Sequence, residues 1–152
     1  MNKELDLARL ILNLSNTIIY NRNKHLEVLG LTSSQADAMK FFLANENTTT
    51  RALKDAMGVT HQTAQGIVSR LVEKGFITVE KSQTDKRCQI VHITEMGLSL
   101  SDKINANGER TAAILISGMS EAEENEFIHL LRIAYQNAKN DGKLGDINYK
   151  IN

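Results

Sequence analysis

Residues 59–75 read VTHQTAQGIVSRLVEKG, and this stretch decides the fold. Thr60 has the residue type and the position of a helix N-cap, and Gly75 is suited to end the helix. Between them an apolar stripe recurs at the spacing of one helical face, formed by Ala64, Ile67, Val68, Leu71 and Val72. The pattern predicts a helix with one buried face and one polar face.

A shorter helix is predicted immediately before it. Residues 48–58, TTTRALKDAMG, offer threonine N-caps and end on Gly58 as a C-terminal stop. Two helices joined by a turn of about three residues are typical of a helix-turn-helix. After Gly75, FITVEK and QIVHIT are rich in β-branched residues and flank the polar stretch SQTDKRCQ at 82–89. A helix-turn-helix followed directly by a β-hairpin predicts a winged helix.

Long helical patterns lie on both sides of this winged helix. Residues 4–19 carry apolar side chains around much of the helix, which indicates burial against a second chain or a central position in a monomer. Thr32 with Gln35, and Ser120 with Glu123, have the spacing of capping boxes. We predict a mostly α (α+β) fold with long terminal dimerisation helices. Its expected parts are a single domain over 1–152, a winged-helix lobe at 32–95, a dimerisation lobe at 1–28 plus 96–140, and a partly disordered tail at 141–152.

Length and composition bound the class of protein. A chain of 152 residues with 41% apolar and 24% charged residues is typical of one globular domain. Apolar runs stay short of the roughly 18 residues of a membrane span, and the start lacks the order of a secretory signal, so we expect a cytoplasmic protein without membrane contact. The formal net charge is zero, but residues 48–92 hold seven cations and four acids. This basic middle is a weak indication of a polyanionic partner.

The polar face of the predicted helix at 60–74 has the chemistry of a base reader. At about 100° per residue, its first half points small, uncharged, hydrogen-bonding groups away from the apolar stripe. Such groups suit base edges in a major groove, where glutamine pairs with adenine. A glycine at position 66 lowers helix stability by on the order of 1 kcal/mol relative to alanine. Its presence on the outward face is explained either by close approach of a partner or by neutral drift.

We therefore predict a DNA-contacting surface on this helix and its neighbours. The threonines at 48–50, Thr49 among them, sit at a helix N-terminus, where they cap the helix and where free N–H groups also favour a phosphate. Arg51 and Lys54 either hold phosphates or are simply solvated. Lys54, Arg70, Lys86 and Arg87 are expected to supply affinity. The residues expected to contact bases or the nearby backbone are Thr60, Gln62, Thr63, Gln65, Gly66 and Ser69.

Four segments in order, LTSSQ (31–35), VTHQTAQGIVSRLVEKGFI (59–77), DKR (85–87) and HITEMG (92–97), resemble the multiple antibiotic resistance regulator (MarR) family of bacterial transcription factors. The resemblance extends over nearly the whole chain. It implies a homodimer in which the first and last helices of both chains interlock. It also implies that each recognition helix enters a major groove while each wing lies in the neighbouring minor groove.

The same resemblance assigns roles to the DKR segment. Arg87 would enter or border the minor groove, whose narrow form attracts arginine. Asp85 would hold that arginine or the wing in place, and Lys86 would face phosphates. This chain departs from the family in having no proline in the wing, few wing charges beyond DKR, and Gly66 in the recognition helix.

The family commonly binds small aromatic or anionic effectors between the dimerisation helices and the winged helix. The resemblance therefore implies an effector pocket with Tyr20, His25, Met39 and Phe42 as candidate lining, although each of these residues also suits a core. Some relatives sense oxidants through a cysteine near the first helix. The single cysteine here, Cys88, lies instead beside Arg87, where it is either a small strand residue or a redox sensor with a lowered pKa.

An enzyme, a cofactor and a metal site are not expected. The chain lacks a glycine-rich phosphate loop and the H-E-x-x-H and G-x-S-x-G motifs, and its four histidines are scattered. We expect a sequence-specific double-stranded DNA-binding transcriptional regulator, a repressor acting as a homodimer on a pseudo-palindromic operator. Two alternatives stay open: a winged-helix interaction module that does not bind DNA, and a redox-responsive regulator using Cys88.

Overall fold

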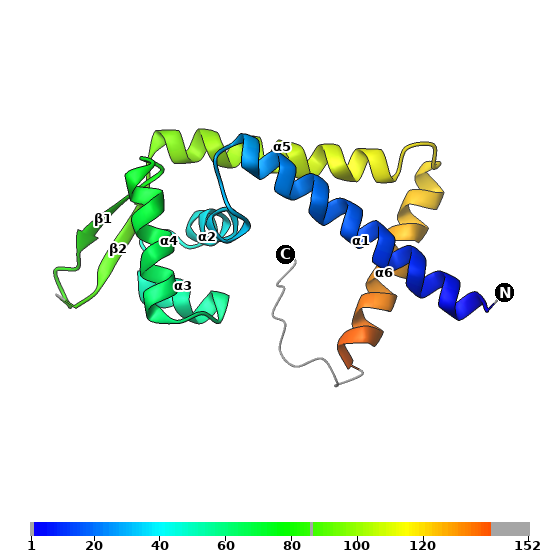
Figure 1. Ribbon diagram of the computed structural model, residues 1–152, viewed down its shortest axis with the longest axis horizontal. Coiled ribbons are helices and arrows are strands. Elements are labelled where there is room, and N and C mark those ends of the chain that lie inside the picture. Colours follow the sequence, from blue (N-terminus) through cyan, green and yellow to red (C-terminus); the bar gives the residue numbers. More distant parts are fainter. Residues whose placement is uncertain (1, 86, 141–152) are drawn as a thin grey trace. The chain divides into compact units, whose positions relative to one another are not determined.

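The computed structural model of the chain describes residues 2–85 and 87–140. The expected tail at 141–152 and Lys86 lie outside the described residues. The elements, labelled in Figure 1, are α1 (Lys3–Val28), α2 (Ser33–Ala44), α3 (Thr50–Met57), α4 (His61–Glu73), β1 (Ile77–Lys81), β2 (Gln89–Ile93), α5 (Glu95–Leu115) and α6 (Glu121–Asn140). The predicted fold class, a mostly helical winged helix-turn-helix, is confirmed.

The chain forms two compact units, Met1–Thr111 and Ala112–Asn152. The first contains α1 to α4, the hairpin and most of α5, while the second contains the end of α5 and all of α6. The predicted division into a winged-helix lobe and a dimerisation lobe stays a prediction.

Side-chain caps set the helix ends where the sequence predicted them. The Thr32 side chain accepts from the backbone N–H of Gln35, and the Gln35 side chain accepts from the backbone N–H of Thr32, so the capping box is complete. Thr49 caps α3 and Thr60 caps α4. Gly58 ends α3 with φ 64°, a left-handed conformation that glycine adopts without steric cost. These caps keep the turn between α3 and α4 short.

The wing is an antiparallel hairpin whose register runs from Ile77 opposite Ile93 to Lys81 opposite Gln89. Its second strand also pairs with the segment just before α3. The backbone N–H of Val91 donates to the Thr48 carbonyl at 2.8 Å, and Thr49 forms an antiparallel bridge with Ile90. The start of α3 is therefore fastened to the wing by backbone hydrogen bonds.

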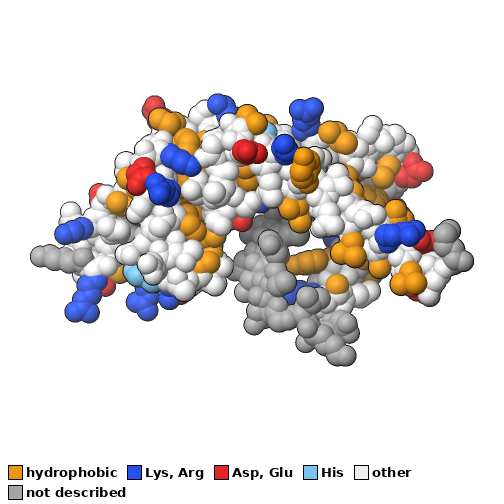
Figure 2. All heavy atoms as spheres, viewed as in Figure 1, with side chains coloured by type: hydrophobic (Ala, Val, Ile, Leu, Met, Phe, Trp, Pro, Cys, Tyr) orange, Lys and Arg blue, Asp and Glu red, His pale blue; other side chains and the backbone are white. Residues whose placement is uncertain are grey.

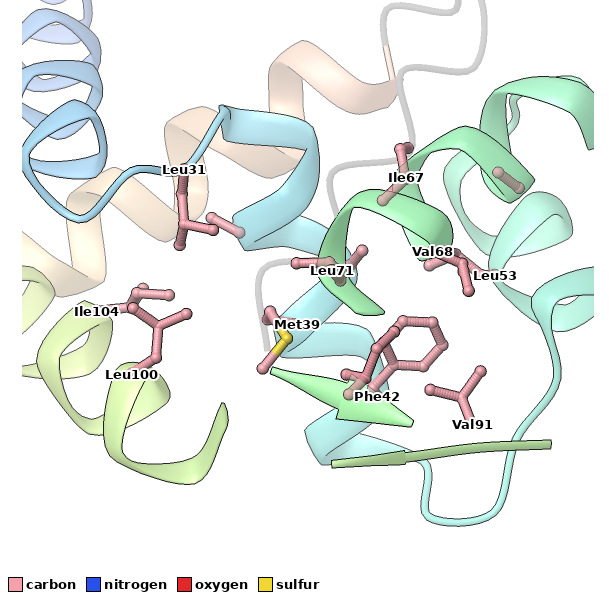
Figure 3. Close-up of a cluster of buried hydrophobic side chains, with 14 of the residues drawn as sticks. Leu31, Met39, Phe42, Leu53, Ile67, Val68, Leu71, Val91, Leu100 and Ile104 are labelled. Atoms are coloured by element: carbon pink, nitrogen blue, oxygen red, sulfur yellow. The ribbon is translucent and has the colours of Figure 1, made fainter. Parts of the chain in front are cut away.

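The core of the first unit lies where α2, α3, α4 and the hairpin meet (Figure 3). Met39, Leu53 and Leu71 have no exposed surface, and Phe42 and Val91 are 3% exposed. The predicted stripe on α4 is buried at four of its five positions, Val72 being the exception at 36% exposure. Val72 lies roughly 80° around the helix from Ala64, at the edge of the buried face.

The start of α5 approaches the backbone just before β1 at Gly97. The Thr94 hydroxyl donates to the Gly75 carbonyl and accepts from the Gly97 N–H. A Cβ on Gly97 would lie 2.1 Å from the carbonyl oxygen of Phe76 and 2.8 Å from Ile93 Cγ2. Only glycine fits this contact, which turns the chain directly from β2 into α5.

Candidate nucleic-acid interface

The exposed face of α4 has the residues that the sequence predicted for it. Gln62, Thr63, Gln65, Ser69 and Arg70 are all exposed. The Thr63 hydroxyl lies 2.9 Å from that of Thr60, so these two hydroxyls are already engaged at the cap. The side-chain amides of Gln62 and Gln65, by contrast, have no hydrogen-bond partner within 2–85 and 87–140. The two glutamines are thus available to read an external partner.

Gly66 lies in the middle of this face. Among the described residues, no side chain and no backbone outside the local helix comes within 4 Å of the position that a Cβ would occupy there. Packing inside the first unit therefore does not require glycine at this position. The absence of a side chain leaves the α4 backbone open to close approach from outside.

Two of the predicted phosphate-binding cations have acidic neighbours on their own helices. Arg70 pairs with Glu73 at 2.9 Å, and Lys54 pairs with Asp55 at 3.1 Å. Exposed pairs of this kind contribute little to stability, so exchanging a carboxylate for an external phosphate costs little. Both cations therefore remain available to a polyanion.

The wing turn is organised by Asp85. Its carboxylate accepts from the backbone N–H of Arg87 at 3.0 Å, and its carbonyl accepts from the N–H of Cys88 at 2.9 Å. Its own N–H donates to Ser82 Oγ at 3.2 Å. The resemblance implied that Asp85 holds either the Arg87 side chain or the wing in place, and these contacts correspond to the second role. In the described part of the chain, the Arg87 side chain is exposed and has no acidic partner within 4 Å.

An open cleft of about 560 Å³ lies between α3, the start of α4 and the wing. Lysine and arginine side chains gather around this end of the first unit (Figure 2). Among the described residues, the lining holds four of these cations and a single acid, Asp85. It brings together five predicted residues, namely Thr49, Lys54, Gln65, Asp85 and Arg87. Thr50 and Arg51, which the sequence offered as possible phosphate contacts, also line it, whereas His61, Lys81, Cys88 and Gln89 were not expected in this site.

Cys88 has a raised pKa, which corrects the lowered pKa that its position beside Arg87 suggested. Burial of the half-exposed thiol is the largest cause. A hydrogen bond from Sγ to Asp85 Oδ2 at 3.5 Å and the Asp85 charge act in the same direction, while the Arg51 charge opposes them. The thiol is therefore mostly protonated at neutral pH, which disfavours redox sensing because thiolates are the reactive form.

We expect Cys88 to be alkylated by iodoacetamide more slowly at neutral pH than an unstructured cysteine peptide. The raised pKa leaves less thiolate to react. Alkylation rates followed by mass spectrometry across a pH series should give a midpoint above that of the peptide. Asp85→Asn removes the neighbouring charge and should move the midpoint down; a midpoint below that of the peptide in the unaltered protein would contradict this.

The predicted effector-pocket residues are distributed between the core and the surface. Met39 and Phe42 are 0% and 3% exposed and offer no surface to a ligand, because both pack inside the first unit. Tyr20 is exposed and lies beneath Lys24 Nζ, which is 5.7 Å from the ring centre. His25 Nε2 lies 3.4 Å from the Lys103 carbonyl. The cleft described above contains none of the four, and the effector pocket stays a prediction.

Within 2–85 and 87–140, no three His, Cys, Asp or Glu side chains are grouped so that they could hold a metal ion. Over the same residues, no helix is both long enough and apolar enough to cross a membrane.

The order α3, α4, β1, β2, with an exposed polar face on α4 and a basic cleft beside it, defines a winged helix-turn-helix protein. Residues 29–87 match the profile of the MarR family. The transcriptional repressor MprA of Escherichia coli K12 is 25% identical over 132 residues, which cover 86% of this chain and 75% of MprA.

Solved structures agree with this fold. A mutant of S. aureus MepR bound to an oligodeoxyribonucleotide superposes with a TM-score of 0.70 at 20% identity, covering 91% of this chain and 99% of that chain. A MarR family protein from Bacillus stearothermophilus gives a TM-score of 0.76 at 18% identity, with the same coverage of 91% and 99%. The chain is therefore similar to MarR-family transcriptional regulators, and the match to the family profile lies in its winged-helix part, residues 29–87.

Proposed function

We propose that this protein is a sequence-specific double-stranded DNA-binding repressor that acts as a homodimer on a pseudo-palindromic operator. The observation that carries the proposal is that two surfaces suited to contact DNA lie together on the first unit. One is the exposed, uncharged face of α4, with the free amides of Gln62 and Gln65. The other is the wing, with an exposed Arg87 that has no acidic partner in the described ranges.

In this proposal α4 lies in a major groove and the wing in the neighbouring minor groove. Gln62 and Gln65 contact base edges through their free amides, which match the donors and acceptors there. Thr63 contacts them through its methyl group, since its hydroxyl is engaged with that of Thr60. Gly66 lets the α4 backbone approach the duplex, because no Cβ stands between them. Arg87 adds a cation where a narrow minor groove has enhanced negative potential.

Exposed apolar surface supports assembly with a second copy. On α1, Leu7, Leu10 and Leu12 are each at least 60% exposed. On α6, in the other unit, Leu130, Leu131 and Ile133 are also exposed. Exposed apolar surface of this extent is typical of interaction sites in soluble proteins. A two-fold dimer would place two copies of α4 on half-sites about one helical turn apart.

Regulation by a small aromatic or anionic effector would act on this dimer. An effector can move the two recognition helices away from the spacing that fits the operator only if it binds more tightly to a dimer with a different spacing. The rival functions have less support. An interaction module would not need the basic cleft and the free wing arginine, and a redox switch at Cys88 would need the thiolate that its raised pKa disfavours.

The proposed function is tested by selecting duplexes from a random library with the purified full-length protein. We expect recovery of a pseudo-palindrome whose binding weakens steeply with salt, because each neutralised phosphate releases counterions. Recovery of no palindrome, or binding that is insensitive to salt, would favour the interaction module.

Gln62→Ala and Arg87→Ala should weaken binding in different ways. Loss of the Gln62 amide should cost about 1–3 kcal/mol at one base position and relax the preference there. Loss of Arg87 should weaken most duplexes together and reduce the slope of log affinity against log salt by about one. Affinity for a panel of single-base variants, measured at several salt concentrations, separates the two. A uniform loss for Gln62→Ala would demote Gln62 to a backbone contact.

A further inference from the structure

We propose that the cleft between α3, α4 and the wing is a phosphate-binding site for the DNA strand that separates the two grooves, with Arg51 and Lys81 as its principal ligands. The proposal rests on the proposed function, in which α4 and the wing occupy neighbouring grooves. It adds a site on the sugar-phosphate backbone and assigns two ligands to it: Lys81, which was not among the predicted DNA contacts, and Arg51, which the sequence left open between a phosphate contact and a solvated residue.

The duplex itself dictates what must pass over the cleft. Neighbouring major and minor grooves are separated by one sugar-phosphate strand, so a protein that reaches into both must let that strand cross between its two readers. The surface between α4 and the wing is this cleft, lined from α3, α4, β1, the turn and β2. A negatively charged strand would therefore lie over Arg51, His61 and Lys81.

The charges of the cleft suit a phosphate. Within 2–85 and 87–140, Arg51 and Lys81 have no acidic partner within 4 Å. The single acid of the lining, Asp85, already accepts hydrogen bonds from the Arg87 backbone and from the Cys88 thiol. Arg51 lies close enough to Cys88 for its charge to act on the thiol, which places the guanidinium near the wing. Two uncompensated cations from separate elements thus face the same space.

The floor of the cleft is held rigidly and contains an unsatisfied polar group. The hydrogen bond from Val91 to Thr48 and the bridge between Thr49 and Ile90 fix α3 against β2. Thr50 lines the cleft at 5% exposure, and its hydroxyl has no hydrogen-bond partner in the described part of the chain. Buried polar groups are costly without a partner. A phosphate at the start of α3, directly or through a water, would supply oxygen atoms there and would also meet the positive end of the helix dipole.

The first test compares salt slopes on the selected duplex for Arg51→Gln, Lys81→Gln and the double variant. Each single variant should reduce the slope by about one and the double variant by about two, since each contact neutralises one phosphate. Base preference should stay unchanged, because phosphate contacts carry no sequence information. Lys103→Gln, which removes an exposed cation on α5, is the matched control and should leave the slope unaltered. Thermal unfolding of each variant checks that folding is intact.

The second test removes the phosphate charge instead of the protein charge. Duplexes carrying one neutral methylphosphonate are scanned across the strand between the two grooves. The unaltered protein should lose affinity roughly tenfold or more at one or two positions, as expected for lost charge-assisted hydrogen bonds. The Arg51→Gln, Lys81→Gln double variant should be insensitive at those same positions.

The outcomes separate this site from the proposed function. Tight, sequence-selective binding with unchanged slopes in the Arg51 and Lys81 variants would overturn the phosphate site and leave the proposed function standing. Failure of the unaltered protein to bind any duplex would overturn both. Binding of inorganic phosphate by the unaltered protein at constant ionic strength, together with an unchanged DNA slope in the double variant, would assign the cleft to a free anion and overturn the proposal.

Discussion

Replacing Gly97 with alanine is expected to destabilise the first unit by about 3 kcal/mol or more. The added Cβ would lie 2.1 Å from the Phe76 carbonyl oxygen and 2.8 Å from Ile93 Cγ2. The first of these neighbours is backbone and cannot turn away, so the start of α5 would have to move relative to β1. The free energy of unfolding, measured by urea titration of the Gly97→Ala variant, tests this directly.

Gly108→Ala, on the same helix, is the matched control. In residues 2–85 and 87–140, no atom outside the local backbone lies within 4 Å of a Cβ at that position, and α5 runs through it without a break. Alanine in an open helix interior should stabilise by about 0.5–1 kcal/mol, because glycine loses more backbone entropy on folding. Equal effects of the two substitutions would show that the contact with Phe76 is not what requires glycine at position 97.

Leu10→Glu on α1 is expected to prevent dimer formation and to weaken operator binding about 100-fold or more. Leu10 is 65% exposed in the single chain, so the substitution leaves the core of the first unit intact. In the proposed dimer it would bury a charge without a partner, which is costly. A monomer would lose the effective concentration that links the two half-site contacts, and this linkage is worth on the order of 10² to 10⁴ in affinity.

Asn16→Glu is the matched control, since it adds the same charge to an exposed, polar position of the same helix. Sedimentation velocity should give a monomer for Leu10→Glu and a dimer for Asn16→Glu and for the unaltered protein. A Leu10→Glu variant that sediments as a dimer would remove this part of α1 from the proposed interface.

Features that depend on residues one helical turn apart were predictable from the sequence. The capping pairs at Thr32 and Ser120, the left-handed stop at Gly58 and the buried side of α4 all follow from local spacing. So does the exposure of Gln62, because a helix that buries Ala64 must turn that position outward. These local rules were enough to identify the winged helix.

Features that depend on contacts between distant segments were not predictable. The cleft forms where the Thr48 carbonyl accepts a hydrogen bond from the Val91 N–H. No local pattern in TTTRALKDAMG predicts a backbone hydrogen bond to a strand about forty residues away. The sequence therefore gave no reason to group Arg51 with Lys81. The pKa of Cys88 was predicted in the wrong direction for a different reason: the residue order did not show that the thiol is partly buried and hydrogen-bonded to Asp85, and both effects raise its pKa.

The bridge between Thr49 and Ile90 has a consequence for the kinds of DNA site this protein can accept. Because α3 is held against β2 by backbone hydrogen bonds and α4 packs on α3, the distance between α4 and the wing within one protomer is expected to stay constant. We therefore expect the major-groove and minor-groove contacts of each protomer to lie a fixed number of base pairs apart, so that adding or removing one base pair between them weakens binding. Any adjustment to operators of different length must then come from movement between protomers.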